Sequence, residues 1–251
     1  MSTTRPVTTP GRPGDIHRST AWLTAAVGAG TLAVSVAALT SPALMQATTR
    51  NLAQLRVGQW WRLITPVLVQ PDGWGQLMFN LLGITVVGAA LEHRTSRPAW
   101  TLTYLLGGGG GIVAISAWHP GDLGGGSSDA VAALIGALTL LLATEIHDHR
   151  LRAGWPAQLY CVFFAAYLTA LDLGGVWWSI LAGNATIVVF AITRRALSPT
   201  ALAWACLPFV AAAGVIMAAD QDGHGLGILT GAAIASLTLL RRRARRNPSI
   251  K

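Results

Sequence analysis

Long apolar segments restrict the fold of this 251-residue chain more than any other feature. A membrane-spanning helix needs about 20 mostly apolar residues, and somewhat fewer where neighbouring helices shield it. With 52% hydrophobic and 11% charged residues, the chain is predicted to be an all-α membrane protein, a polytopic helical bundle of about eight transmembrane helices. The predicted spans are approximately 21–39, 76–91, 99–118, 128–144, 156–171, 175–192, 201–219 and 224–240. Several are short or rich in glycine, which predicts a compact bundle with closely spaced helices.

The basic residues orient these spans, because cytoplasmic loops retain Lys and Arg. All but three of the 18 basic residues precede the first span or follow the second, fourth, sixth or eighth. The exceptions, Arg50, Arg56 and Arg62, lie in the first loop on the opposite side, which is therefore external. Both termini are predicted to be cytoplasmic. The net charge of +8 comes from basic residues that set the topology and attract anionic membrane lipid. The sequence contains no folded basic domain, so nucleic acid is not expected as a partner.

The chain outside the spans divides into two tails and one long loop. Residues 1–18 have no apolar run and are predicted to be a disordered cytoplasmic tail. Residues 19–240 form one transmembrane domain, and 241–251 form a basic cytoplasmic tail. The first apolar segment is long enough to span and is expected to remain as a helix rather than be cleaved as a signal peptide. The external loop 40–75 is rich in apolar residues and tryptophan, so we expect it to be structured and to lie partly in the outer leaflet.

A polar turn, residues 124–130, leads directly into the fourth span. It places the hydroxyl groups of Ser127 and Ser128 at the mouth of a membrane helix, where polar groups are costly and are often functional. A second interpretation is an N-cap, because a serine satisfies free N–H groups at a helix start and Asp129 suits the helix dipole there. The two interpretations are compatible.

Three motifs around the second span carry a family resemblance. They are GQWWRLIT at 58–65, GWGQLMFNLL at 73–82 and GAALE at 88–92. Together they resemble the first loop and second helix of the rhomboid intramembrane serine proteases. The resemblance implies a rhomboid-like core and covers roughly residues 50–192 and 222–240.

The polar turn matches the place where rhomboids carry a GxSG motif and, eight residues after the serine, a glycine. Counting back from Gly136 selects Ser128, with Gly126 two residues before it. Asp129 stands where the family usually has the last glycine of the motif. The resemblance implies that Ser128 is the nucleophile, and Ser127 remains the other candidate.

A serine nucleophile needs a general base, which in rhomboids is a histidine followed by glycines three and seven residues later. His224 has Gly227 and Gly231 at these positions. Three spans separate it from Ser128, whereas the common layout has one and would place the histidine at Ile180, whose side chain accepts no proton. Two additional spans preserve parity, so the helices beginning at Ser128 and His224 enter from the same external face. Four of the remaining histidines are predicted to be cytoplasmic, namely His17, His93, His147 and His149. The fifth, His119, is predicted to lie in an external loop.

The oxyanion donors are predicted from the second span. Rhomboids place a histidine four residues before an asparagine there, and this chain has Gln76 and Asn80. This spacing puts both side chains on one helix face, and the glutamine amide can donate hydrogen bonds. The alternative is that Gln76 is an interfacial polar residue and Asn80 a buried structural one. Asp172, Asp220 and Asp222 are interpreted as external loop acids, and Cys161 and Cys206 as buried apolar residues.

The resemblance implies an intramembrane serine protease of the cell membrane. Such an enzyme is expected to need no cofactor or metal ion, because a Ser128–His224 dyad suffices. Its expected partners are transmembrane protein substrates, cleaved near their external end. The alternative is a proteolytically inactive rhomboid-like protein that binds transmembrane clients, suggested by Ile180, Gln76 and Asp129. A small-solute transporter is disfavoured, since the chain has no visible inverted repeat and no charged residue at a span midpoint. Nothing in the sequence indicates the substrate-binding residues.

Overall fold

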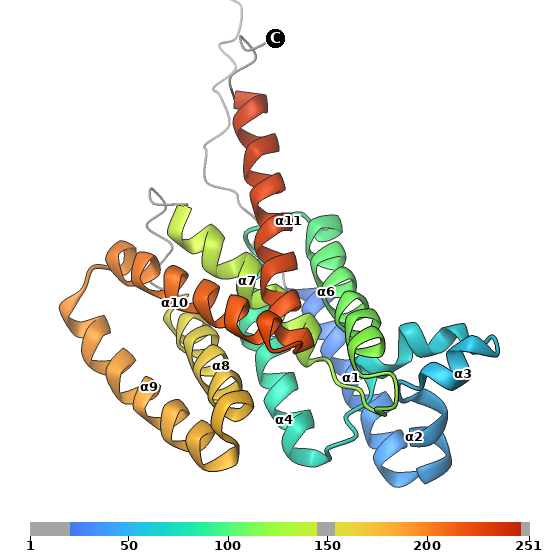
Figure 1. The fold of residues 1–251 in the computed structure, drawn as a ribbon. Coiled ribbons are helices and arrows are strands. Elements are labelled where there is room, and N and C mark those ends of the chain that lie inside the picture. Colours follow the sequence, from blue (N-terminus) through green and yellow to red (C-terminus); the bar gives the residue numbers. More distant parts are fainter. Residues whose placement is uncertain (1–20, 145–153, 247–251) are drawn as a thin grey trace, which may run out of the picture.

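The computed structural model describes residues 21–144 and 154–246 (Figure 1). The predicted tail 1–18 lies outside the described residues, as does the predicted basic tail from residue 247 onward. Within the described ranges the chain folds into helices joined by loops, with one isolated β-bridge between Arg50 and Gly124. The prediction of an all-α fold is confirmed.

Eight helical segments make up the bundle. They are α1 (Trp22–Thr40), α4 (Trp74–Gly83) continued by the π-helix η3 (Ile84–Gly88) and α5 (Ala89–Glu92), α6 (Arg97–Trp118), α7 (Ser128–Thr144), α8 (Trp155–Gly174), α9 (Val176–Ala196), α10 (Pro199–Ala219) and α11 (Gly223–Arg246). In the described part of the chain, seven of them are long and apolar enough to cross a membrane, and α7 is a shorter apolar helix. This agrees with the predicted number of spans.

The helix ends follow ordinary local chemistry. Ser96 and Ser198 precede α6 and α10, and their hydroxyl oxygens accept hydrogen bonds from backbone N–H groups in the first turn. Glu92, in the Leu-Glu motif, accepts bonds from the backbone N–H groups of Leu23 and Thr24 and thereby satisfies the start of α1. Gly175 adopts a φ of 77° between α8 and α9, a conformation that favours glycine and permits the tight reversal.

The loop between α1 and α4 is folded. It contains α2 (Pro42–Thr48), α3 (Leu52–Arg56) and two 3₁₀ turns, η1 (Trp60–Leu63) and η2 (Thr65–Leu68). The buried Arg62 guanidinium donates to the carbonyl groups of Gln46 and Thr49 and to the side chain of Gln59. The arginine of the Trp-Arg motif therefore cross-links this loop, while Trp60 and Trp61 remain exposed.

Helix α7 lies inside the bundle, where 14 of its 17 residues are buried. It packs against α6, α10, α11 and the α4–η3–α5 segment, so a helix of this length is shielded on most sides. Its closest approach is to α11: a Cβ added to Gly231 would overlap the Ala133 carbonyl, and one added to Gly136 would overlap the Ile228 carbonyl. The glycines of α7 and α11 thus allow backbone-to-backbone contact.

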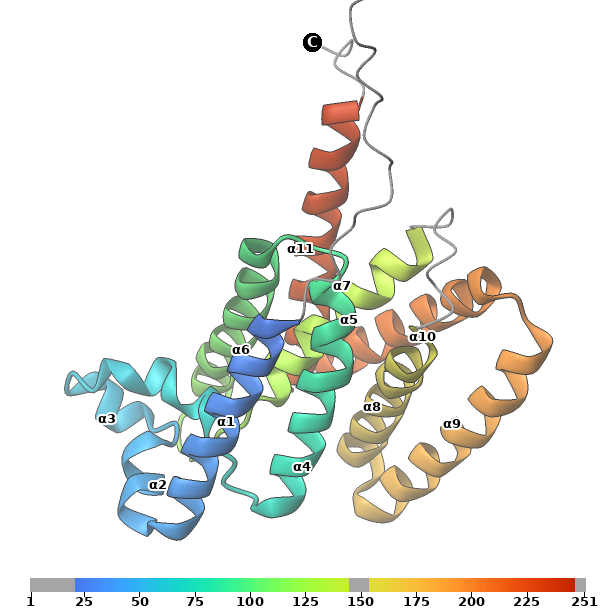
Figure 2. The same ribbon diagram turned by 180° about the vertical axis from the view of Figure 1, so that it is seen from behind.

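Helix α9 packs mainly on α8 and lies at the edge of the bundle (Figures 1 and 2). Ile180 belongs to this peripheral helix, and 43% of its surface is exposed. Because α11, rather than α9, is the extensive partner of α7, the chain follows the layout predicted from His224 and not the one in which Ile180 would occupy the histidine position.

Candidate active site

The backbone before α7 is held by the first loop. The N–H of Arg50 donates to the carbonyl of Gly124 at 2.7 Å, and the N–H of Gly126 donates to the carbonyl of Pro66 at 2.8 Å. Gly126 has a φ of 142°, which disfavours any residue with a Cβ. The loop carrying the Trp-Arg motif therefore fixes the path of the chain into the two serines.

The two serines differ in availability. Ser127 is fully buried, and its Oγ accepts a hydrogen bond from Gln70 Nε2 at 3.1 Å. Ser128 is half-buried, and its Oγ makes no hydrogen bond within the described residues. A Cβ on Gly126 would lie 3.3 Å from Ser128 Oγ and 2.7 Å from Gln76 Nε2, so these two groups border the same space. Ser128 is thus the accessible hydroxyl beside an amide donor.

The two predicted oxyanion residues lie in different environments. Gln76 is half-buried; its Nε2 donates to the Gly125 carbonyl at 3.1 Å and its Oε1 accepts from the Asp72 N–H at 3.1 Å. Asn80 is fully buried, and its Nδ2 donates to Gln70 Oε1 at 2.7 Å. Gln76 therefore borders the same space as Ser128, whereas Asn80 supports Gln70, which in turn bonds Ser127.

Gln70 completes this network but was not expected from the sequence. It is a fully buried polar residue in the first loop and links Asn80 to Ser127. Its position just before a Pro-Asp-Gly turn gives no sign that its side chain turns inward, so only the three-dimensional structure identifies it.

His224 is the second residue of α11 and is oriented from three sides. Its Nδ1 lies 2.6 Å from Asp222 Oδ1, and the edge of its ring packs against Phe164 of α8 with centroids 5.9 Å apart. On the opposite side, Nε2 lies 3.7 Å from Asp129 Oδ1. The imidazole side chain is 20% exposed, so the ring is held in position but remains partly open to solvent.

Asp129 occupies a space that glycines provide. A Cβ on Gly111 of α6 would overlap the Asp129 carboxylate, and one on Gly223 would lie 3.0 Å from its Oδ1. Asp129 is buried, and its Oδ1 has no hydrogen-bond partner. The carboxylate that replaces the usual glycine of the GxSG motif is therefore accommodated by glycines on two neighbouring segments.

Ser128 and His224 lie at the same end of one helix pair. Gly227, one turn after His224, is so close to α7 that a Cβ there would be 2.5 Å from the Asp129 carbonyl oxygen. No hydrogen bond joins Ser128 to His224 in the described part of the chain. Asp129, the residue that follows the serine, approaches His224 Nε2 to 3.7 Å through its Oδ1.

Charge at this end of the bundle is predominantly negative. Burial alone would raise the pKa of Asp222, but the charge of His224 and the N–H groups it donates hold that pKa below its usual range. A carboxylate oxygen from each of Asp129 and Asp222 and a ring nitrogen of His224 lie within 4.8 Å of one another. Two carboxylates and an imidazole are suitable ligands for a divalent cation such as zinc.

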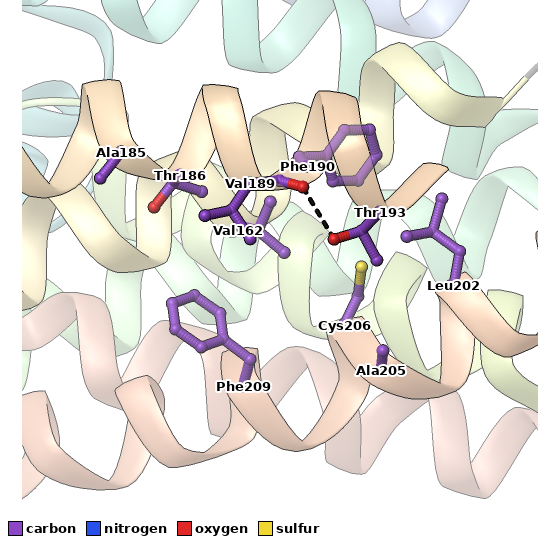
Figure 3. A pocket seen from close by; sticks show the side chains of 10 residues that line it. All are labelled: Val162, Ala185, Thr186, Val189, Phe190, Thr193, Leu202, Ala205, Cys206 and Phe209. Atoms are coloured by element: carbon purple, nitrogen blue, oxygen red, sulfur yellow. Dashed lines mark hydrogen bonds between the residues drawn. The ribbon is translucent and has the colours of Figure 1, made fainter. Parts of the chain in front are cut away.

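A separate apolar crevice of about 400 Å³ lies between α8, α9 and α10 (Figure 3). Its lining contains Thr186 and Thr193, whose hydroxyl groups donate to carbonyls of their own helix, at Ala182 and Val189. None of the serine, histidine or aspartate residues discussed above lines it. The only other reactive group in its lining is the thiol of Cys206, and no residue there can act as its base. The crevice is therefore not the candidate active site.

The fold and this end of the bundle define a multi-pass helical membrane protein in which a serine and a histidine lie at the starts of two packed helices. The rhomboid domain family model matches residues 57–241, more than half of the chain, and the protein belongs to the rhomboid family. It is 32% identical over 94 residues to rhomboid protease GluP of Bacillus subtilis (strain 168), covering 38% of this chain and 18% of that protein. It is 33% identical over 86 residues to putative rhomboid protease YdcA of the same organism, covering 34% of this chain and 43% of that protein. The chain thus spans less than half the length of either relative, and no solved structure matches it.

Proposed function

We propose that this rhomboid family member is an intramembrane serine protease that cleaves transmembrane proteins near the external end of their spans. The observation that carries the proposal is the position of His224, whose Nε2 lies 3.7 Å from the residue next to Ser128 although three helices separate the two in sequence. Membership of the rhomboid family and the names of the two relatives support the same class of reaction.

In the proposed mechanism, Ser128 Oγ attacks the carbonyl carbon of the scissile peptide bond while His224 Nε2 accepts the hydroxyl proton. His224 then returns that proton to the leaving amine. Water attacks the acyl-enzyme in the second half of the reaction, again with His224 as base. These steps use only side chains of the chain itself, and the serine must turn toward Nε2 when substrate binds.

The oxyanion is proposed to be stabilised by Gln76 and by the backbone N–H of Ser128. Gln76 Nε2 borders the same space as Ser128 Oγ, which supports a direct role. Asn80 is proposed to contribute through Gln70, to which its amide donates, because it is fully buried. The two amide side chains are therefore not equivalent donors, because Gln76 and Asn80 lie in different surroundings.

The alternative is a non-proteolytic protein that binds transmembrane clients, and one contact motivates it. Asp129 Oδ1 faces His224 Nε2, which is the nitrogen that Ser128 must reach. If an ion pair between Asp129 and a protonated His224 persisted during substrate binding, that nitrogen would be unavailable as a base.

The full-length protein in lipid nanodiscs should be treated with a fluorophosphonate probe, and the labelled peptide identified by mass spectrometry. Proteolysis predicts labelling at Ser128, its loss in Ser128→Ala and His224→Ala, and parallel loss of cleavage of a transmembrane reporter. His119→Ala is the matched control, since His119 lies in the loop after α6 and should not affect either readout. An unlabelled wild-type protein that still binds the reporter would instead establish the client-binding alternative.

A further inference from the structure

Asp222 makes two hydrogen bonds to the same residue. Its Oδ1 accepts from the backbone N–H of His224 at 2.9 Å and lies 2.6 Å from His224 Nδ1. The first bond is that of a helix N-cap, which stabilises the start of α11. The second has no role in capping, and its length is typical of a charge-assisted bond. Asp222 is therefore placed to control the imidazole as well as the helix.

We propose that Asp222 is a positioning residue that converts the Ser128–His224 pair into a chain of three, by holding the proton of His224 on Nδ1. This inference rests on the proposed function and adds a residue to it. An imidazole has two nitrogens, and the hydrogen bond made by one of them decides which tautomer is present. With Nδ1–H donated to Asp222, the lone pair is on Nε2, the nitrogen on the side of α7.

The unpartnered oxygen of Asp129 is compatible with this tautomer. Asp129 Oδ1 is buried without a hydrogen bond and lies 3.7 Å from Nε2. A carboxylate oxygen and a nitrogen lone pair are both acceptors, so no hydrogen bond can form between them while His224 is neutral. When Nε2 takes the serine proton, it becomes a donor beside a waiting acceptor.

The protonated ring would then lie between two carboxylates. Asp222 faces it from the loop before α11, Asp129 from α7, and Asp172 from the end of α8 also acts on it electrostatically. Arg50 from the first loop opposes this field through its effect on Asp129. The arrangement favours the imidazolium formed during serine attack, as the buried aspartate does in serine proteases with a Ser-His-Asp triad.

The capping and orienting roles can be separated with Asp222→Asn. Asparagine caps a helix about as well as aspartate, but it is neutral, and its NH₂ group can donate to Nδ1 and so favour the wrong tautomer. The equivalent change in triad proteases lowers kcat about 10⁴-fold. Since Asp222 is also 16% exposed, we expect a smaller loss here, on the order of 100-fold in the rate of Ser128 labelling.

The test measures the fluorophosphonate labelling rate of Ser128 in full-length protein in nanodiscs between about pH 5 and 9, which covers the charge change of an imidazole. For Asp222→Asn we expect the rate loss given above and a midpoint of the pH profile at lower pH, because removal of a negative charge favours the neutral ring. Asp220→Asn is the matched control: it removes a nearby carboxylate that makes no hydrogen bond to His224 in the described structure, and it should change neither value.

A second readout does not depend on the serine. Modification of His224 by diethyl pyrocarbonate is followed across the same pH range by mass spectrometry, in Ser128→Ala with and without Asp222→Asn. The inference predicts a lower midpoint when Asp222 is replaced. Unchanged labelling rate and midpoint in Asp222→Asn would overturn it and leave Asp222 as a cap. Absence of Ser128 labelling in the wild type would overturn the proposed function, and with it the catalytic role inferred for Asp222. The His224 modification profile would still show whether Asp222 controls the protonation of the ring.

Discussion

Replacement of Gly227 by alanine tests whether the α7–α11 contact sets the geometry of the site. Gly227 lies on α11 one turn after His224, and it faces the first turn of α7. An added Cβ would lie 2.5 Å from the Asp129 carbonyl oxygen and 2.9 Å from the Ala132 Cβ. Both neighbours are backbone or short side chains, which cannot rotate away. The two helices must therefore separate.

The required movement can be estimated from ordinary contact distances. A carbon and a carbonyl oxygen approach no closer than about 3.3 Å in packed helices, so the helices must move apart by roughly 0.8 Å near residue 227. A misplacement of about 1 Å between reacting groups costs on the order of 100-fold in rate. The overpacking itself should destabilise the fold by about 1 to 3 kcal/mol. We therefore expect a folded protein whose Ser128 reactivity falls about 100-fold.

The assay is the rate of fluorophosphonate labelling at Ser128 in nanodiscs, measured beside thermal unfolding. Gly110→Ala is the matched control, because Gly110 lies on α6 with nothing within 4 Å of an added Cβ. It should keep both reactivity and stability. If Gly227→Ala were folded and labelled at the wild-type rate, the α7–α11 spacing would not determine the approach of Ser128 and His224, and the mechanism proposed for the pair would lose its structural basis.

Two further predictions concern the charges around His224. Zinc should inhibit Ser128 labelling reversibly, with recovery after chelation, because one ligand atom from each of Asp129, Asp222 and His224 lies within 4.8 Å of the others. Asp222→Asn should raise the zinc concentration for half-inhibition about 10-fold or more. Equal inhibition of both proteins would exclude this site. Because the pKa of Asp222 is lowered in the folded protein, its ionised form contributes stability above its unfolded pKa of about 3.9, and this contribution is lost as the pH falls toward the folded pKa. The melting-temperature difference between wild type and Asp222→Ala should therefore be full at neutral pH and narrow in acid, whereas a constant difference would mean that only the cap is lost.

The helices could be predicted from the sequence because their lengths follow from the thickness of a bilayer. The exact ends of the helices were harder to predict. Helix α11 begins at Gly223 and continues to Arg246, beyond the last apolar residue of the predicted span, because a helix need not end where its composition becomes polar. The π-helix Ile84–Gly88 within the second span contains no proline, and Gly83 and Gly88 at its ends do not by themselves predict it. These features depend on packing rather than on local composition.

The candidate site shows a similar division. Glycine spacing predicted Ser128 and His224 as the dyad, and this stays a prediction. The structure shows that these glycines allow the two helices to touch. Gln70 and the bond from Asp222 to the imidazole were not predicted, and Asp222 was interpreted only as a loop acid. For Asp222 a usable signal existed: an aspartate two residues before His224, at a helix start, matches a capping pattern. For Gln70 no such signal existed, because its partners Asn80 and Ser127 come from distant segments.

Asp129 provides the strongest structural argument between the two proposed functions. A buried carboxylate oxygen without a hydrogen bond destabilises the folded state, typically by a few kcal/mol. In a protein that only binds clients, nothing would offset this destabilisation, and the glycine usual in the GxSG motif would remove it. In the proposed protease, His224 Nε2 becomes a donor when it is protonated, and an approach of the two atoms from 3.7 Å to hydrogen-bond distance would offset this cost in the intermediate. The room left for Asp129 by Gly111 and Gly223 therefore favours a residue that acts during catalysis over one that has merely replaced a lost glycine.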